Sequence, residues 1–599
     1  MLVLDLKIHT VVVVFVGCSS ELLLCGYDVI AMKRRLLEAL GPETAGGRGW
    51  VSIRGNSARL LPPGPSNLDE LFAWPLDIAR AIGSERPSPA GPGEGEARVH
   101  RLHAVLNRGL HCDSLYSGFD CPRWAITPTL DAVVAHYGFQ FSNPDHVVIT
   151  FGSACDWGDL QRLVLYAIST ACDDSKSCVM KNIMDRLPQT ARNMIETLSP
   201  PSTASGWEKK ICMEEIRKWL MENRAWVFRP QATSDCMVHE QHCFCYGGFR
   251  TEPESELDPE AAASDSAAKK KRPWCISTAG VTCVAWSSVG SRDGDAHTSE
   301  IFHHVWQAER VALAELRLED VAFVECVPRY PAAERLGRQM SEACLAFWVV
   351  VGSQYLAFPS LRERFLGALL NRLTVEWHGP PSQEAVEIEF MHLFARSMQM
   401  TATDLICESD ESRWAMYLHI ANERGKKTGR VFTNEELIAL PPWQLLTLIQ
   451  PVGAPQRLDE WYVFMEANHP VQEGEAFFCD IDHHPGTRST GGREWPSQLT
   501  HGTVLAVFER ERWKMATPKE YMGALGFHSL PDYCSRFSMS PAVKVIDRLG
   551  LTDKEVRLLC GNGMHLMTQA AWMTYVLSNI SEKEPLCDEC VDDQDDEWS

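Results

Sequence analysis

The sequence lacks any apolar run long enough to span a membrane. Its most apolar stretch, VVVVFVG at residues 11–17, is far shorter than the about 20 residues that a transmembrane helix needs. We expect this stretch to form a buried strand rather than the apolar part of a signal peptide. The mean hydropathy of -0.18 is also typical of a globular, soluble chain, so no membrane partner is expected.

The chain also lacks the cysteine pattern of a disulfide-stapled secreted protein. Its 21 cysteines are spread over 599 residues without regular spacing, whereas stapled folds are short and dense in cysteine. A reducing compartment is therefore expected. The basic run KKKR at residues 269–272 fits a nuclear signal, and without such a signal the protein would be cytoplasmic.

A net positive charge, which phosphate binding normally draws on, is absent. Lys and Arg number 57 against 79 Asp and Glu, which gives a formal net charge of -22. Much of the acid is local, at residues 251–260 (TEPESELDPE) and 592–599 (DDQDDEWS). Because such runs are usually solvated, the charge argues against a protein that coats nucleic acid but says little about an active site.

Short apolar runs alternate with helical patterns through the middle of the chain. HVVITFGSA (146–154) and ISTAGVTCVAWS (276–287) predict strands, and DLQRLVLYAIST (159–170) and EIFHHVWQAERVALAELRL (300–318) predict helices. This alternation predicts an α/β fold with a mostly parallel sheet. In such sheets ligands bind beyond the carboxyl ends of the strands.

Two residues at the ends of predicted strands form a candidate catalytic pair. Cys283 follows the strand-like run WCISTAG, and Glu325 lies near the end of the run DVAFVEC. A cysteine alone is more often a buried structural residue. A thiol and a carboxyl group at the carboxyl ends of two strands of one sheet would, however, share one cleft.

This pair resembles the Pro-Cys and Glu-Asn-Val motifs of the cytosine-C5 methyltransferases, with Thr282 in place of the proline and Cys326 in place of the asparagine. The resemblance implies a Rossmann-like methyltransferase that uses S-adenosylmethionine and makes 5-methylcytosine. In the implied mechanism Cys283 attacks carbon 6 of the base while protonated Glu325 supports nitrogen 3, so that carbon 5 takes the methyl group. Such a cysteine needs a lowered pKa, and a base in a duplex must be flipped out of its stack.

Further motifs of the family follow in order. DSLYSGFDCPRW (113–124) is similar to the first cofactor motif. The matching residues, and hence the implied cofactor contacts, are Tyr116, Ser117 and Gly118. Asp120 and Cys121 stand where the family usually has glycines.

The next two motifs complete the implied cofactor site. The strand that leads to Asp156 resembles the motif whose acid holds the ribose hydroxyls of S-adenosylmethionine. Asn182 takes the place of the aspartate that contacts the adenine, and an amide can still make that hydrogen bond. LLNRLTVEW (369–377) is a partial match to a later motif with two arginines that face the active site, and it makes Arg372 the candidate.

Two closing motifs end the series. WKMATPKEYMGALGFHSLPD (513–532) closely resembles the ninth motif, which has an organising role in the family. EVRLLCGNGMHLMTQAAWMTYVLSNI (555–580) is similar to the last motif, a Gly-Asn pair followed by a helix that packs beside the first strand, and adds Asn562 to the cofactor candidates. The matched stretches cover somewhat under half of the chain.

Composition and motifs together divide the chain. Pro- and Gly-rich residues 61–98 predict a linker, and the acidic, Ala- and Ser-rich residues 252–272 predict an exposed loop. The predicted parts are an N-terminal segment with this linker (1–99), the cofactor-binding part of the catalytic domain (100–200), a cysteine-rich insertion with the acidic loop (201–272), the nucleophile part (273–380), a target recognition segment (381–498), the closing motifs (499–582) and an acidic tail (583–599).

One cluster has no counterpart in the family. The stretch CMVHEQHCFC (236–245) is dense enough in ligands to bind zinc. Its candidate ligands are Cys236, His239, His242, Cys243 and Cys245. Their spacing matches none of the usual paired Cys-x2-Cys frameworks, and the lone Cys-x-x-Cys at 587–590 is an equally weak signal, so we predict no metal site.

The substrate and the activity stay open from the sequence. DNA is the predicted partner, but RNA also fits, because the family includes members that act on tRNA with the same chemistry. Altered motif positions, among them Thr282 and Cys326, also fit a binding or regulatory protein that keeps the fold and has lost turnover. A small-molecule enzyme would leave the pairing of Cys283 with Glu325 unexplained.

Overall fold

The computed structural model describes most of the chain from residue 61 to residue 584. The gaps are residues 86–92, 117, 142, 144–145, 173–176, 247–270, 282, 288–292, 469–472, 486–491, 497–501, 510 and 531–537. The chain divides into two units, Met1–Leu60 and Leu61–Ser599. The predicted cysteine pair at 587–590 and most of the acidic tail lie outside the described residues.

The first unit is described only through two strand pairs. They are β1 (Leu2–Leu6) with β2 (His9–Val13), and β3 (Trp50–Ile53) with β4 (Ser57–Leu60), both antiparallel. The strand expected in the apolar run at 11–17 is confirmed as far as Val13. The side chains of this unit lie outside the description.

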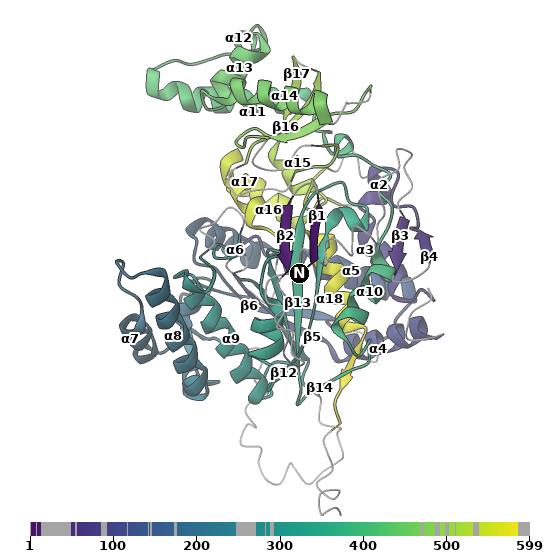
Figure 1. The fold of residues 1–599 in the computed structure, drawn as a ribbon, viewed down its shortest axis with the longest axis vertical. Helices are drawn as coiled ribbons and strands as arrows, with labels where there is room; N and C mark the ends of the chain where they lie inside the picture. The colour runs from purple at the N-terminus through teal and green to yellow at the C-terminus, as the bar shows by residue number, and fades with distance from the viewer. Residues whose placement is uncertain are drawn as a thin grey trace, which may run out of the picture. The chain divides into compact units, whose positions relative to one another are not determined.

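A sheet of nine described strands forms the centre of the second unit, in the order β12-β13-β11-β10-β5-β6-β7-β8-β9 (Figure 1). The strands are β5 (Leu110–Leu115), β6 (Ile149–Cys155), β7 (Cys178–Met180), β8 (Thr233–Cys236), β9 (Gln241–Phe244), β10 (Trp274–Gly280), β11 (Val321–Cys326), β12 (Cys344–Gly352) and β13 (Glu363–Asn371). Strands β11, β10, β5, β6 and β7 pair in parallel, and the outer pairs are antiparallel. The predicted α/β fold with a mostly parallel sheet is confirmed.

Helices cover both faces of this sheet because successive side chains of a strand point to opposite sides. In β11, Val321 and Phe323 pack into one core, and Ala322 and Val324 pack into the other. The first core is covered by α3 (Trp74–Ile82), α4 (Glu94–Arg108), α5 (Cys121–Tyr137), α6 (Asp159–Cys172), α10 (Gln383–Phe394), α16 (Pro541–Leu549), α17 (Asp553–Asn562) and α18 (Leu566–Leu577). The second core is covered by α7 (Gln189–Leu198), α8 (Gly206–Val227) and α9 (Glu300–Glu315). In Figure 1 these three helices lie to the left of the central strands, and α3, α5 and α10 lie to the right.

The sequence predicted a linker over residues 61–98, but this stretch is part of the second unit. It forms α2 (Leu68–Leu71), α3 and the start of α4. Trp74 is buried and its indole N–H donates to the carbonyl of Gly526 at 3.1 Å, and buried Arg98 forms an ion pair with Glu389 at 3.1 Å. The apolar residues of α3 recur at helical spacing, and the proline of this helix lies in its first turn, where proline is tolerated.

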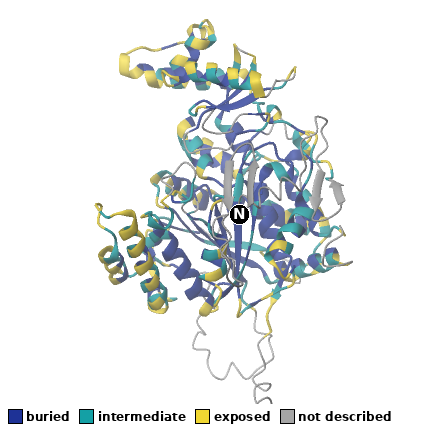
Figure 2. Ribbon diagram, viewed as in Figure 1, coloured by how far each residue is buried: buried dark blue, intermediate teal, exposed yellow. Residues whose placement is uncertain are grey.

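A third hydrophobic core lies in the predicted recognition segment. It is formed by α11 (Asp410–Gly425), α12 (Asn434–Ile438), α13 (Pro442–Ile449), α14 (Ala454–Asn468), β15 (Phe477–Asp480), β16 (Val504–Glu509) and β17 (Arg512–Met515). Helix α10, which the sequence placed in this segment, instead packs on α3, α18 and β12. The segment with its own core therefore begins after α10 and extends to Met515. Exposed residues are frequent on α11–α13 and on α7–α8, whereas the inner strands β5, β10 and β11 are buried (Figure 2).

A buried ion pair joins this segment to the ninth motif. Helix α15 (Pro518–Gly523) begins with a capping box made by Thr517 and Glu520. The Glu520 carboxylate also accepts a hydrogen bond from Arg413 of α11 at 2.7 Å, with both side chains buried. None of the described helices is long and apolar enough to cross a membrane.

Candidate active site

Four segments that are distant in sequence meet at the carboxyl end of β10. Gly280, the last residue of β10, lies opposite Glu325 in the parallel ladder. A Cβ atom on Gly280 would lie 3.0 Å from Met564, 3.5 Å from the carbonyl oxygen of Tyr116 and 3.8 Å from the Glu325 carboxylate. Glycine therefore leaves room where the ends of β5, β10 and β11 meet the turn after α17. Cys283 follows three residues after Gly280, and so the structure brings the predicted pair to one edge.

Glu325 has a charged partner that the sequence analysis missed. The Arg364 Nε lies 2.9 Å from Glu325 Oε1, and both side chains are mostly buried. The charges of Glu325, Arg364 and Arg362 all act on the Cys283 thiol. The signal in the sequence was LRERF at 361–365, because arginines two apart at the start of a strand lie on the same side of it.

The prediction that Arg372 faces this site is wrong. Strand β13 runs antiparallel to β11, with Leu366 opposite Glu325 and Leu370 opposite Val321. Arg372 therefore lies beyond the amino end of β11, and its Nε donates to the carbonyls of Ser341 at 2.8 Å and Cys344 at 3.3 Å. The sequence match lay at the end of β13, whereas Arg362 and Arg364 at its start lie near Glu325 and Cys283.

The Cys283 thiol is partly buried. Its pKa is raised, whereas the proposed chemistry led us to expect a lowered pKa. Burial is the largest cause, and the negative charge of Glu325 adds to it, while Arg364 and Arg362 act in the opposite direction. Removing a thiolate from water disfavours the charged form. At neutral pH the resting residue is therefore a thiol, and it must lose its proton before or during attack.

The loop that carries Cys283 is anchored to α9. The Cys283 carbonyl accepts hydrogen bonds from the N–H groups of Trp286 at 3.0 Å and Ser287 at 2.7 Å, which closes a turn. The Trp286 indole N–H donates to Glu300 at 3.1 Å, and Glu300 forms an ion pair with Arg335 at 2.8 Å. Burial raises the pKa of Glu300 to about 7, against the effect of Arg335. Thr282, the altered motif position, lies outside the described residues.

The last motif is tied to the same edge through Arg362. Its guanidinium donates to the carbonyl of Gly561 at 3.0 Å and also to that of Gly563, and burial together with the neighbouring Arg364 lowers the pKa of Arg362 to about 9. A Cβ atom on Gly563 would lie only 3.2 Å from the Cys121 sulfur. The predicted cofactor residue Asn562 is exposed at the end of α17.

The turn after β5 has the features of a cofactor cradle. Gly118 has a positive φ of 52°, and a Cβ atom there would meet no atom of the described residues within 4 Å. Its N–H donates to the Asp156 carboxylate at 2.8 Å, and burial raises the pKa of Asp156. Tyr116 also has a positive φ and its hydroxyl donates to the Phe302 carbonyl at 2.8 Å, while Ser117 lies outside the described residues. Open space beside a backbone turn and an acid fits S-adenosylmethionine.

Trp157 is a feature of this edge that the sequence analysis did not use. It follows Asp156 directly, at the carboxyl end of β6, and its side chain is 71% exposed. A large exposed aromatic ring offers a face on which a flat heterocycle can stack. The signal in the sequence was a tryptophan directly after the candidate acid.

Two departures from the family pattern have a structural explanation. Asp120 replaces a glycine as the N-cap of α5, with φ 53°, and its carboxylate forms an ion pair with Arg123 at 2.7 Å. Aspartate is among the few residues that adopt this left-handed conformation. The ion pair with Arg123 balances the negative charge of the Asp120 carboxylate. Asn182 caps the 3-10 helix η1 (Ile183–Arg186), because its side-chain oxygen accepts the Met184 N–H at 2.9 Å.

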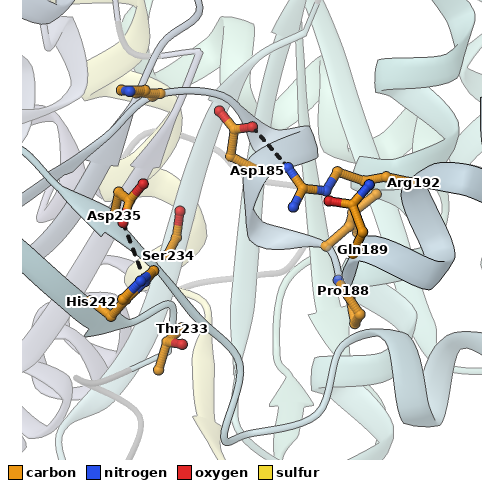
Figure 3. Close-up of a pocket in the computed structure, with 10 residues that line it drawn as sticks. Asp185, Pro188, Gln189, Arg192, Thr233, Ser234, Asp235 and His242 are labelled. Atoms are coloured by element: carbon orange, nitrogen blue, oxygen red, sulfur yellow. Dashed lines mark hydrogen bonds and ion pairs between the residues drawn. The ribbon is translucent and has the colours of Figure 1, made fainter.

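A polar cavity of about 310 Å³ lies between the segment from η1 to α7 and the β8–β9 hairpin (Figure 3). Its walls carry two ion pairs, Asp185 with Arg192 at 3.4 Å and Asp235 with His242 at 3.3 Å. Neither Cys283 nor Glu325 lines it. The cavity is therefore separate from the ends of β10 and β11.

No family model and no curated protein matches this chain, but solved structures do. The chain is similar over 78% of its length to the methyltransferase EhMeth of Entamoeba histolytica, covering 98% of that chain at 10% identity with a TM-score of 0.33. It is similar over 78% of its length to the Dnmt2 methyltransferase of S. pombe (98% of that chain, 12% identity, TM-score 0.34). A putative DNA modification methyltransferase encoded within an E. coli prophage matches over 79% (98% of that chain, 11% identity, TM-score 0.32). At such low identities and TM-scores we base the functional conclusion on the residues of this chain.

Proposed function

We propose that this protein is an S-adenosylmethionine-dependent methyltransferase that acts on carbon 5 of cytosine in DNA. The observation that carries the proposal is the meeting of Cys283, Glu325 and Arg364 at the carboxyl edge of the sheet. The open turn at Gly118 follows the neighbouring strand β5. A nucleophile and a carboxyl group beside a cofactor cradle are what this chemistry requires.

Each residue at this edge has a role in the proposed reaction. The Cys283 sulfur forms a bond to carbon 6 of the base, and the electrons of the 5,6 double bond make carbon 5 nucleophilic. The proton that the Cys283 thiol gives up passes to the Glu325 carboxylate, which shares it with nitrogen 3 and so stabilises the charge that develops on the ring. Arg364 orients Glu325. Carbon 5 then takes the methyl group and loses its proton to solvent. The carbon–sulfur bond breaks as the double bond re-forms, and the proton held between Glu325 and nitrogen 3 returns to the Cys283 sulfur.

S-adenosylmethionine would supply the electrophilic methyl group. Its proposed contacts are the turn at Tyr116, Ser117 and Gly118, the carboxylate of Asp156, and the side chains of Asn182 and Asn562. The Asp156 carboxylate accepts hydrogen bonds from the N–H groups of Gly118 and Gly158. The acid is therefore held in place before any ligand binds. A fixed acceptor loses little freedom when a ribose hydroxyl is bound.

A methyl-transfer assay on matched DNA and RNA tests both the activity and the substrate. Tritium from labelled S-adenosylmethionine should enter cytosine-containing DNA with the wild type and stay at background with Cys283→Ala. Cys212→Ala, at a partly buried cysteine of α8, is the matched control and should behave as the wild type. Incorporation into RNA alone would replace DNA as the substrate. Equal background for wild type and Cys283→Ala on both nucleic acids would overturn the enzyme proposal and leave a binding protein.

A further inference from the structure

Three cysteines and one histidine lie close together at the outer strands β7–β9, at the opposite end of the sheet from β12 and β13. Cys178 is the first residue of β7, Cys236 ends β8, His239 lies in the hairpin turn, and Cys243 lies in β9. Their ligand atoms all lie within 4.8 Å of one another. The antiparallel pairing of β7 with β8, which sets Met180 opposite Cys236, brings Cys178 to the hairpin from 58 residues away along the chain.

The three sulfurs lie at nearly equal distances from one nitrogen of His239. Its Nδ1 lies 3.4 Å from the sulfur of Cys178, 3.3 Å from that of Cys236 and 3.4 Å from that of Cys243. One imidazole nitrogen has either one proton or one lone pair, so it cannot make a full hydrogen bond with all three sulfurs. A single cation at the centre satisfies all four groups at once.

From this arrangement we propose that Cys178, Cys236, His239 and Cys243 form a structural zinc site. Tetrahedral zinc with Zn–S near about 2.3 Å and Zn–N near about 2.0 Å separates sulfur from nitrogen by about 3.5 Å, close to the separations in the structure. Thiolate and imidazole ligands are soft and select zinc over magnesium or calcium. Three cysteines and a histidine fill the coordination sphere, so this zinc holds structure rather than activating water.

The structure sorts the candidates of the cysteine-rich stretch. His242 points to Asp235 and lines the polar cavity, and Cys245 is buried in the second core among apolar residues. Neither belongs to the cluster. The fourth ligand is Cys178, which lies in another part of the sequence, and this is why the local spacing matched no known framework.

The hairpin has little else to hold it. In β9 only Cys243 is partly buried, and its three neighbours are exposed. The core beneath the hairpin turn has three buried residues, Ala154, Leu165 and Val179, against which Met237 and Val238 pack. Because a short two-stranded hairpin is marginal in water, a metal that links it to β7 fixes an edge that apolar burial leaves weak. That edge also supplies Thr233, Ser234 and Asp235 to the cavity in Figure 3.

Metal content of the purified full-length protein tests the site directly. Inductively coupled plasma mass spectrometry after dialysis should find about one zinc per chain in the wild type, and less than about a tenth of that in Cys236→Ser and Cys178→Ser. His242→Ala, in the same hairpin but outside the cluster, and Cys212→Ser are controls that should keep the zinc. Zinc at background in the wild type, or zinc retained by both cluster variants, would overturn the proposal.

Spectroscopy keeps the test valid if a cluster variant fails to fold. X-ray absorption of the wild type should show three sulfur neighbours at about 2.3 Å and one nitrogen at about 2.0 Å. Cobalt exchanged into the protein should give the intense near-ultraviolet bands of cobalt–thiolate charge transfer and the visible bands of tetrahedral cobalt. A shell of oxygen and nitrogen only, or a disulfide between two of these cysteines in the zinc-free wild type, would contradict the site.

Discussion

Cysteines have different surroundings in two regions of the sheet, the carboxyl end of β10 and the outer strands β7–β9. At the end of β10, the charges of a carboxylate from β11 and of two arginines at the start of β13 act on the Cys283 thiol. At β7–β9, three sulfurs surround one imidazole nitrogen. In the first arrangement charged groups surround a partly buried thiol. In the second the sulfurs and the imidazole nitrogen lie around one common centre. The surroundings, and not the residue type, decide which cysteine reacts and which one holds structure.

Glu325→Gln should have the largest effect on methyl transfer and no effect on the zinc site. The amide keeps the shape of the side chain but cannot supply the proton at nitrogen 3, so single-turnover methyl transfer should fall by about 10²–10⁴-fold. The zinc content should stay as in the wild type, because the cluster lies at the other edge. Unchanged methyl transfer in a variant that still binds S-adenosylmethionine by calorimetry would remove Glu325 from the mechanism.

Arg364→Ala against Arg372→Ala tests which arginine serves the active edge. Loss of the 2.9 Å ion pair leaves Glu325 without its positioning partner, and kcat should fall about tenfold to a hundredfold with little change in KM for S-adenosylmethionine. Arg372→Ala removes bonds to carbonyls at the opposite end of β13 and should leave kcat unchanged. The reverse ranking would restore Arg372 as the active-site arginine.

The rate of alkylation should distinguish Cys283 from the cluster by its pH dependence. The pKa of Cys283 is raised above its ordinary value of 9.0, so its thiolate fraction is small at neutral pH. Its rate with iodoacetamide, followed by peptide mass spectrometry, should therefore rise about tenfold per pH unit between about pH 7 and about pH 9.

Two comparisons sharpen this pH experiment. Glu325→Gln removes the negative charge that helps to raise the pKa of Cys283, so the profile should move to lower pH. The cluster cysteines should react slowly at every pH while zinc is bound and quickly after a chelator has removed it. A flat profile for Cys283 would mean a preformed thiolate, contrary to the raised pKa.

His242→Ala should have the smallest effect. The His242–Asp235 pair is exposed, with side chains 73% and 69% accessible, and exposed pairs contribute little to stability. The free energy of unfolding should change by less than about 0.5 kcal/mol, as measured by urea titration. A large loss of stability together with a loss of zinc would mean that His242 binds the metal.

The sequence predicted the parts of the molecule that depend on local pattern. The strands that lead to Cys283, Asp156 and Glu325 were visible as apolar runs, and their common edge followed from the carboxyl-end rule for parallel sheets. Helices such as α6 and α9 were visible from their apolar spacing. The mostly parallel order of the central strands followed from the alternation of the two.

The parts that the sequence missed depend on pairing between distant strands. Arg364 reaches Glu325 only because β13 turns back antiparallel beside β11, and no local pattern contains that direction. Cys178 joins the hairpin only through the β7–β8 pair. The raised pKa of Cys283 depends on burial, which the fold and not the motif determines. Residues 61–98 were misjudged because their prolines and glycines outweighed the apolar spacing of α3.

A covalent trap tests the central claim most directly. An oligonucleotide with 5-fluorocytosine, incubated with the protein and S-adenosylmethionine, blocks the loss of the group at carbon 5 and so keeps the carbon–sulfur bond intact. The account predicts a stable adduct that survives denaturation and maps by peptide mass spectrometry to Cys283, with none formed by Cys283→Ala. A protein that binds S-adenosylmethionine yet forms no adduct with DNA or RNA, or forms one at another cysteine, would contradict it.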